Sequence, residues 1–276
     1  ENDQAKAYYF IGKDNIVFHT IIWPAMLMGY GGLNLPFDVP ANEFLTFEMK
    51  KFSTSRNWAV WLPDYLSRYS ADPLRYLLSI NMPETTDTDF SWREFVRRNN
   101  DELVATYGNL VHRVLTFTCR NYDCAVPSPA NLDGIDQQIL GKAEETLKMM
   151  DDLISRCRFK DAIKTAMNLA QEANRYLDEK SPWKIIKQNR QLAGNSLYVA
   201  LSVLSCLRTA FYPFLPFSSQ KLHEYLGYTG KIETLGWKFN PPPAGQKLLV
   251  PQPLFTKLEE KIVDEENARL EHTMEE

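Results

Sequence analysis

The chain has 276 residues, which is long enough for about two domains, each with a buried core. Hydrophobic residues make up 44% of the sequence and charged residues 24%, a balance that excludes a mostly disordered chain. No apolar run approaches the ~20 residues of a membrane-spanning helix, so we expect no membrane partner. The sequence begins without methionine or an apolar signal segment, and we expect that it was cut from within a longer chain.

Negative charge is concentrated at the end of the chain. The formal net charge is −4, and residues 257–276 hold eight acidic but only three basic residues. The rest of the chain is therefore nearly neutral, and any phosphate-binding surface must be a local cluster. The four cysteines form no C-x-x-C pair, so we expect free thiols in a reducing cytosol and no bound metal.

Residues 1–90 indicate the last part of a parallel α/β sheet, in which strands alternate with helices. Apolar segments at 8–11 and 44–47 predict short buried strands. A lysine-rich turn is expected at 50–51, directly after the second strand. A few strands of a parallel sheet expose an unpaired edge, so this region should be less stable than the rest unless a partner covers it.

Two helices are expected in the same region. Asp14 can cap the first helix, and the glycines within residues 29–32 can end it. Asp72 is a suitable cap for the second helix, since Pro73 then occupies the first helical position. These helices would pack against the strands.

Residues 91–228 are expected to form an all-helical bundle. Apolar residues recur at helical spacing over 92–120, 133–157, 160–178, 192–212 and 218–226. Short connections between long helices favour an antiparallel bundle. Residues 229–276 begin proline-rich and become acidic, so we expect an extended strap that packs back and then frays into an acidic tail. The predicted fold class is therefore α+β overall.

The first candidate site lies near the start of the chain. His19 and Trp23 are four residues apart and share one face of the first helix. Under a strand end, these two side chains would make a mostly apolar pocket with one polar group, which suits a small amphiphilic ligand. A histidine on an apolar helix is also compatible with an ordinary core residue.

The second candidate site is the basic loop that follows the second strand. Lys50, Lys51 and Arg56 surround the hydroxyls of Ser53 and Ser55. Cations and hydroxyls on a loop can hold triphosphate oxygens and stabilise charge in phosphoryl or adenylyl transfer. A solvated basic turn has the same composition.

The third candidate site is on the long helix of the bundle. Asn109 and Arg113 are four residues apart, and both side chains can form paired hydrogen bonds to base edges. Trp183 follows the helix-breaking Pro182, where its indole can stack on an unpaired base. The alternatives are the solvated side of an amphipathic helix and a tryptophan that fills the bundle interior.

Taken together, three motifs resemble the methionyl-tRNA synthetase family of class I aminoacyl-tRNA synthetases, in its C-terminal part. The family's methionine-pocket segment is similar to the stretch within residues 10–25, which reads F-I-G-K-D and then F-H and W-P-A. K-F-S-T-S at 51–55 lies where the K-M-S-K-S loop belongs, and N-R-Y-L-D-E with S-P-W-K at 174–184 is similar to the anticodon-domain signature. The resemblance covers about residues 8–226.

This resemblance implies a methionine–tRNA ligase, which activates methionine with ATP and transfers it to tRNA(Met) in the cytoplasm. Methionine, ATP (with Mg²⁺) and the tRNA(Met) anticodon would be its ligands. Residues 1–90 would be the end of a Rossmann-like catalytic domain, 91–228 the anticodon-binding bundle and 229–276 the strap and tail. The first half of the catalytic domain would be a further partner.

The resemblance also implies roles for single residues in the catalytic part. His19 and Trp23 would line the methionine pocket, and Gly12 and Asp14 would face the adenylate. The loop would bind ATP phosphates through its catalytic residues Lys51, Ser53, Thr54 and Ser55. Thr54 replaces the motif's second lysine, a departure for which Lys50, Lys51 or Arg56 can compensate.

In the bundle, the resemblance implies that Asn109, Arg113, Pro182 and Trp183 contact the C-A-U anticodon, the tryptophan by stacking. The chain contains no H-I-G-H sequence, which the family carries in the first half of its catalytic domain. We therefore expect the chain to be inactive alone. The alternatives are a non-catalytic anticodon-binding module and a helical scaffold that binds proteins through its acidic tail.

Overall fold

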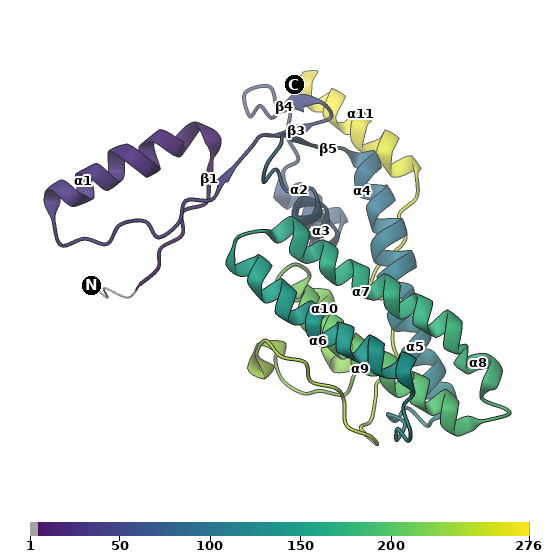
Figure 1. Ribbon diagram of the computed structural model, residues 1–276. Helices are drawn as coiled ribbons and strands as arrows, with labels where there is room; N and C mark the ends of the chain where they lie inside the picture. The colour runs from purple at the N-terminus through teal and green to yellow at the C-terminus, as the bar shows by residue number, and fades with distance from the viewer. Residues whose placement is uncertain (1–4, 276) are drawn as a thin grey trace. The chain divides into compact units, whose positions relative to one another are not determined.

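The computed structural model describes residues 5–275, and side chains as far as residue 270. The described chain divides into two compact units (Figure 1). The first unit contains the residues up to Val60, Asn81–Ser91 and the chain from Ala268, and the second contains Trp61–Ile80 and Trp92–Asn267. The expected combination of short strands with a helical bundle is confirmed. No helix within residues 5–275 is long and apolar enough to cross a membrane.

The first unit contains two small sheets. Strand β1 (Ile11–Gly12) pairs in parallel with β2 (Ala41–Asn42). Strand β3 (Leu45–Phe47) lies between β5 (Thr88–Phe90), which is parallel to it, and β4 (Lys50–Lys51), which is antiparallel. The parallel pairings confirm the predicted type of sheet.

The segment at 8–11 is not the buried strand that its composition predicts. Only its last residue, Ile11, belongs to β1, while Tyr8 is 38% and Phe10 52% exposed. Within the part of the chain that the structure describes, β1 pairs only with β2, and a two-stranded ladder gives its side chains little cover.

Lys50 and Lys51 are not the turn that the sequence predicts. The chain reverses one step earlier, at Glu48 and Met49, whose φ angles are 46° and 62°. Lys50 and Lys51 consequently continue as β4, antiparallel to β3. Left-handed conformations at two successive non-glycine residues are uncommon, which is why the sequence did not indicate this turn.

The helical segment of the first unit runs from η1 (Lys13–Asn15) through η2 (Phe18–Ile22) to α1 (Trp23–Tyr30). It ends at Gly31, whose φ of 81° favours glycine, as the sequence predicts. Asp14 is not the cap, because it lies inside the first turn. There its charge still complements the positive end of the helix dipole.

The second unit begins with α2 (Leu62–Arg68), which the sequence analysis did not predict, followed by α3 (Ala71–Ile80). Asp72 lies within α3 and is 3% exposed, so its predicted role as the cap is wrong. Its carboxylate accepts hydrogen bonds from the backbone N–H and the hydroxyl of Ser218, both at 2.6 Å. A buried carboxylate needs such partners, and these join α3 to the bundle.

The bundle helices follow the predicted segments within a few residues. They are α4 (Trp92–Arg98), η3 (Asn99–Gly108), α5 (Asn109–Asn121), α6 (Gly134–Ser155), α7 (Phe159–Lys180), α8 (Pro182–Ile185), α9 (Arg190–Phe211) and α10 (Pro216–Tyr225). The first three form one continuous helical rod. Helices α6, α7 and α9 pack against one another (Figure 1), and α9 is buried along most of its length.

The last part of the chain is extended except for η4 (Ile232–Leu235) and α11 (Lys261–Glu275). The expected fraying is therefore wrong for 261–275. Glu266 on α11 is 3% exposed, forms an ion pair with Arg68 at 2.9 Å and accepts a hydrogen bond from the Tyr69 hydroxyl at 2.7 Å. These contacts anchor the start of α11 to α2.

We expected all four cysteines to be free thiols, but two of them are bonded to each other. Cys119 and Cys124 form a disulfide, while Cys157 and Cys206 remain thiols. The chain leaves α5 between the paired cysteines and turns back at Asp123, whose φ is 53°. That turn brings the two residues together, a proximity that their spacing in the sequence did not indicate.

Helix α6 begins with a complete capping box. Asp133 accepts hydrogen bonds from the N–H groups of Ile135 and Asp136 at 3.0 and 3.1 Å, and Asp136 accepts one from Asp133 N–H at 3.1 Å. Lys180 at the end of α7 contacts Asp133 at 2.5 Å. Hydrogen bonds from Lys180 and the backbone hold the pKa of Asp133 below its ordinary value.

We predict that Asp133→Ala lowers the free energy of unfolding by about 1 kcal/mol at pH 7, the usual contribution of a cap. Asp133→Asn should retain most of the stability, since asparagine also caps. Because the folded pKa is depressed, the contribution of the charge is present above about pH 4 and is lost as the pH falls through the folded pKa. Urea unfolding followed by circular dichroism measures this. The control is Asp151→Ala, an exposed acid on the same helix; equal losses in the two alanine variants would contradict the prediction.

Candidate nucleic-acid interface

Arg113 and Trp183 pack together, as the sequence predicts. The guanidinium carbon of Arg113, on α5, lies 4.8 Å from the centroid of the Trp183 ring. Trp183 is half-buried, so part of its ring faces the bundle and part faces solvent. A cation over an indole at this distance is favourable. The arrangement therefore holds the two side chains as one partly exposed surface.

The position of Trp183 follows from the chain reversal at the end of α7. Ser181 has left-handed backbone angles (φ 42°, ψ 56°), and its hydroxyl donates to the carbonyl of Asp178 at 2.6 Å. Pro182 is buried and begins α8, where its fixed φ suits the first helical residue. The reversal is therefore rigid, and it brings Trp183 back toward α5.

Asn109 and Arg113 line one side of a hollow of about 440 Å³. The rest of the lining comes from the end of η3 and from α7: Ala105, Thr106, Gln171, Asn174, Arg175 and Asp178. Asn109 is exposed at this hollow. Asn109, Arg113 and Trp183 thus lie on one polar, solvated surface, as expected. We call these three residues and the hollow the recognition face.

Two residues of α7 hold the Arg113 side chain. Its Nη1 donates to Asp178 Oδ1 at 3.2 Å, and its Nη2 donates to Asn174 Oδ1 at 3.1 Å. The sequence analysis placed both residues in the N-R-Y-L-D-E motif but gave neither a role of its own. Their spacing of four on one helix was the available signal, because it places both side chains on the same helix face.

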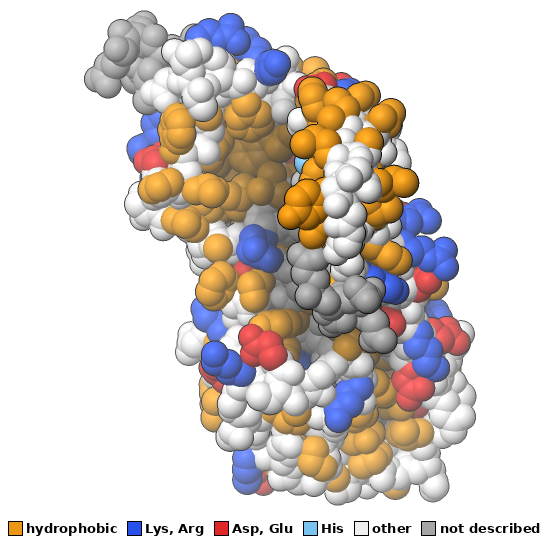
Figure 2. All heavy atoms as spheres, turned by 90° about the vertical axis from the view of Figure 1, so that its left-hand side faces the viewer, with side chains coloured by type: hydrophobic (Ala, Val, Ile, Leu, Met, Phe, Trp, Pro, Cys, Tyr) orange, Lys and Arg blue, Asp and Glu red, His pale blue; other side chains and the backbone are white. Residues whose placement is uncertain are grey.

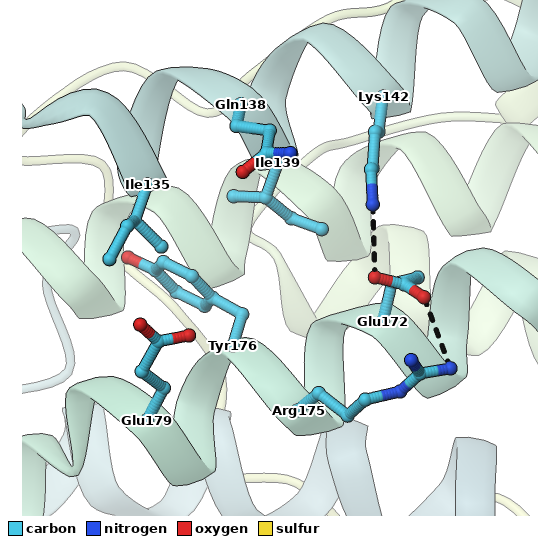
Figure 3. A pocket seen from close by; sticks show the side chains of 8 residues that line it. All are labelled: Ile135, Gln138, Ile139, Lys142, Glu172, Arg175, Tyr176 and Glu179. Carbon is cyan, nitrogen blue, oxygen red and sulfur yellow. Dashed lines mark hydrogen bonds and ion pairs between the residues drawn. The ribbon is translucent and has the colours of Figure 1, made fainter.

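A second, smaller hollow of about 190 Å³ lies between α6 and α7 (Figure 3). Glu172 lies between Lys142 and Arg175, with ion-pair distances of 3.1 and 3.0 Å (Figure 3). Because this carboxylate offsets the two cations, the hollow is less suited to a phosphate than a free cation cluster would be. Arg175 also lines the larger hollow.

The basic loop of the first unit is a tight turn held at its base. The backbones of Ser53 and Trp58 pair in both directions, with N–H to carbonyl distances of 3.0 and 2.8 Å. The Trp58 indole N–H donates to the Phe47 carbonyl at 2.9 Å, and Lys50 Nζ lies 4.5 Å from the centre of the Trp58 ring. The loop is therefore attached to β3, while its tip is exposed.

The predicted phosphate-binding groups lie at and beside this tip. Lys51, Thr54 and Ser55 are exposed. The hydroxyl oxygens of Ser53 and Ser55 are 3.2 Å apart, and Arg56 Nε donates to Ser53 Oγ at 3.3 Å. The loop therefore gathers two hydroxyls and a guanidinium, a donor set that suits phosphate oxygens.

His19 and Trp23 share one helix face, as predicted, with ring centroids 6.1 Å apart. Tyr9, which the sequence analysis missed, meets the Trp23 ring edge-on at 4.6 Å. His19 Nδ1 lies 3.0 Å from the Asn15 carbonyl oxygen, a hydrogen bond that orients the imidazole. The three rings form an aromatic cluster with one polar edge.

Gly12 and Asp14 lie exposed at the start of the same helical segment, between β1 and this cluster. Lys13, between them, forms ion pairs with Glu43 and Asp87 instead of facing solvent freely. The predicted pocket residues therefore follow one another along the chain, from the carboxyl end of β1 into the helical segment.

Hydrophobic side chains crowd the upper half of the face shown in Figure 2. Eight large hydrophobic residues of the helical segment at 13–30 are at least 41% exposed: Ile16, Val17, Phe18, Ile21, Ile22, Met26, Met28 and Tyr30. Apolar surface of this extent is typical of an interaction site or a ligand-binding groove. We call these residues the apolar face.

Comparison with protein families gives two matches. Residues 1–115 match the model for class I tRNA synthetases (M), and residues 126–275, more than half of the chain, match the anticodon-binding domain of methionyl tRNA ligase. The chain belongs to the methionyl-tRNA synthetase family. The recognition face draws Trp183 and α7 from the second match, and Asn109 and Arg113 from the first.

Similar members of this family include two curated bacterial proteins named methionine–tRNA ligase. The one from Dehalococcoides mccartyi is 62% identical over 265 residues, which cover 96% of this chain and 48% of that protein. The one from Chloroflexus aurantiacus is 48% identical over 313 residues, covering 98% of this chain and 52% of that protein. The chain therefore spans about half the length of these relatives.

A solved structure of the family has the same fold. The structure of Mycobacterium tuberculosis methionyl-tRNA synthetase bound by methionyl-adenylate superposes with a TM-score of 0.82 at 26% sequence identity. The match covers 91% of this chain and 50% of that one.

Proposed function

We propose that this chain is part of a methionine–tRNA ligase, which activates methionine with ATP and transfers it to tRNA(Met) in the cytoplasm. The chain would supply anticodon recognition, the K-M-S-K-S-like loop and part of the methionine pocket. Its domains would be residues 1–90, 91–228 and 229–276, as the sequence predicts. The observation that carries the proposal is the packing of Arg113 over Trp183 beside Asn109, in a chain that matches the anticodon-binding domain.

The recognition face has the chemistry to hold unpaired bases of the C-A-U anticodon. A base can stack on the exposed part of the Trp183–Arg113 pair, because aromatic rings and guanidinium planes both stack on bases. The Asn109 amide and the Arg113 guanidinium then offer hydrogen bonds to base edges. Pro182 contributes by fixing the reversal that presents Trp183.

We predict that Trp183→Ala weakens binding of a C-A-U anticodon stem-loop by ~1–3 kcal/mol, the usual contribution of one stacked base. Fluorescence anisotropy of a labelled stem-loop measures the affinity. Trp237→Ala is the matched control, since Trp237 is 37% exposed but hydrogen-bonds to Leu147, away from the recognition face. Equal losses of affinity in the two variants would contradict the stacking role.

In the catalytic part, the methionine carboxylate would attack the ATP α-phosphate, and the tRNA hydroxyl would then attack the adenylate. Such transfers depend on positioning and electrostatic stabilisation. Lys51, Ser53, Thr54 and Ser55 would bind the phosphates, with Mg²⁺ accompanying ATP. His19 and Trp23 would line the methionine pocket, and Gly12 and Asp14 would face the adenylate.

We also propose that the remainder of the catalytic domain, with the H-I-G-H group, covers the apolar face. The exposed apolar side chains support this, because burying them would remove a large hydrophobic area from water. The site residues around β1 would then lie at the edge of a complete sheet. Phosphate-binding groups from both halves would meet at one nucleotide.

We predict that ATP–pyrophosphate exchange by this chain alone is near background, because each preorganised donor lost costs ~10²–10³ in rate. Adding the separately produced remainder of a family member's catalytic domain should raise the exchange rate. Ile21→Asp, on the apolar face, should abolish that rise, whereas Phe217→Asp, an exposed apolar residue of α10, should not. Exchange by the chain alone at the rate of an intact synthetase would contradict the proposal.

A non-catalytic anticodon-binding module is the second candidate function. The recognition face lies entirely within the second unit, so binding of an anticodon does not require the catalytic groups of the first. Stem-loop binding without any exchange, even with the added remainder, would favour this candidate. The scaffold alternative is less well supported, since Glu266 of the acidic segment is anchored to α2.

A further inference from the structure

We propose that Asn174 is the positioning residue of the recognition face, which fixes both the Arg113 guanidinium and the start of α5. This inference rests on the proposed anticodon-binding function. Asn174 lies on α7 and lines the same hollow as Asn109 and Arg113. It is half-buried, and it makes three hydrogen bonds to three different residues.

The Asn174 amide can take only one orientation. Its Nδ2 donates to the carbonyl oxygens of Thr106 and Ala170, at 3.1 and 3.0 Å. A flipped amide would place its oxygen against two carbonyl oxygens, which is repulsive. The observed orientation therefore directs Oδ1 to Arg113 Nη2, at 3.1 Å. Arg113 receives a fixed acceptor, which limits the freedom of a long side chain.

The same amide holds the backbone from which α5 starts. Thr106 lies near the end of η3, a π-helical segment, and its carbonyl also accepts a hydrogen bond from Asn109 N–H. π-Helical turns in longer helices occur frequently at functional sites, because they shift which side chains share a face. By binding the Thr106 carbonyl, Asn174 fixes the register in which Asn109 and Arg113 point to the recognition face.

Arg113 keeps donors for a ligand. Its Nη1 and Nη2 each donate one hydrogen bond, to Asp178 and Asn174, and each of these nitrogens carries a second N–H. The open hollow lies beside this guanidinium. A bound base can therefore accept hydrogen bonds from Arg113 while Asn174 still holds its side chain.

The test measures discrimination between anticodons and not affinity alone. The test uses four stem-loops: one carries C-A-U, and the other three each have one anticodon base replaced. Each is titrated against the full chain and against its Arg113→Ala, Asn174→Ala and double variants. Asn174→Ala should reduce discrimination about tenfold at the same anticodon position that Arg113→Ala relaxes, within the range of one base-reading contact. At that anticodon position the double variant should lose no more discrimination than Arg113→Ala alone, because there Asn174 acts through Arg113.

Two further variants keep the test decisive. Lys164→Ala, an exposed residue of α7 outside the hollow, should bind like the unmodified chain. Asn174→Asp keeps an oxygen toward Arg113 but places its second oxygen against the Thr106 and Ala170 carbonyl oxygens, so it should also reduce discrimination at the same position. Circular dichroism shows whether Asn174→Ala folds. If it does not, Asn174→Asp is used in its place, and unchanged discrimination in that variant would overturn the inference.

Other outcomes separate this inference from the proposed function. Equal weakening of all four stem-loops by Asn174→Ala, or additive losses in the double variant at the position that Arg113 reads, would overturn the positioning role and leave anticodon binding intact. If Arg113→Ala and Trp183→Ala both bind C-A-U stem-loops with unchanged affinity, the anticodon-binding function itself fails.

Discussion

The packing of the Arg113 guanidinium over the Trp183 indole is the contact on which the recognition face depends. It joins two helices that are far apart in the sequence and leaves part of the ring in solvent. Neither side chain achieves this alone. Trp183 requires the left-handed Ser181 and the buried Pro182, and Arg113 requires its acceptors on α7. The result is a polar surface whose geometry is set before any ligand binds, which lowers the entropy cost of binding.

The two units differ in how complete their candidate sites are. In the second unit, buried polar contacts join the helices to one another. Examples are the contacts of Asp72 with Ser218 and of Glu266 with Arg68. The recognition face lies on this rigid support. The first unit has sheets of two and three strands and a helical segment whose apolar side chains are exposed. Its loop and aromatic cluster are formed locally, while the proposed catalytic site needs groups from elsewhere.

Much of the bundle could be predicted from sequence, because apolar residues at helical spacing and the cap at Asp133 are local signals. The i, i+4 spacing also placed His19 with Trp23 correctly. Features that depend on distant partners could not be predicted. Glu266 stabilises α11 through Arg68, 198 residues away in the sequence, and an acidic segment read alone suggests fraying. The partner of Asp72 was missed for the same reason. The turn before β4 was missed because left-handed conformations at non-glycine residues are uncommon.

The most direct measurement is a crystal structure of the chain with a C-A-U anticodon stem-loop. This account predicts an unstacked anticodon base on the Trp183–Arg113 pair, with a second base edge hydrogen-bonded within the hollow beside Asn109. RNA bound elsewhere, with the Trp183 ring still facing solvent and Arg113 in contact only with Asn174 and Asp178, would contradict it.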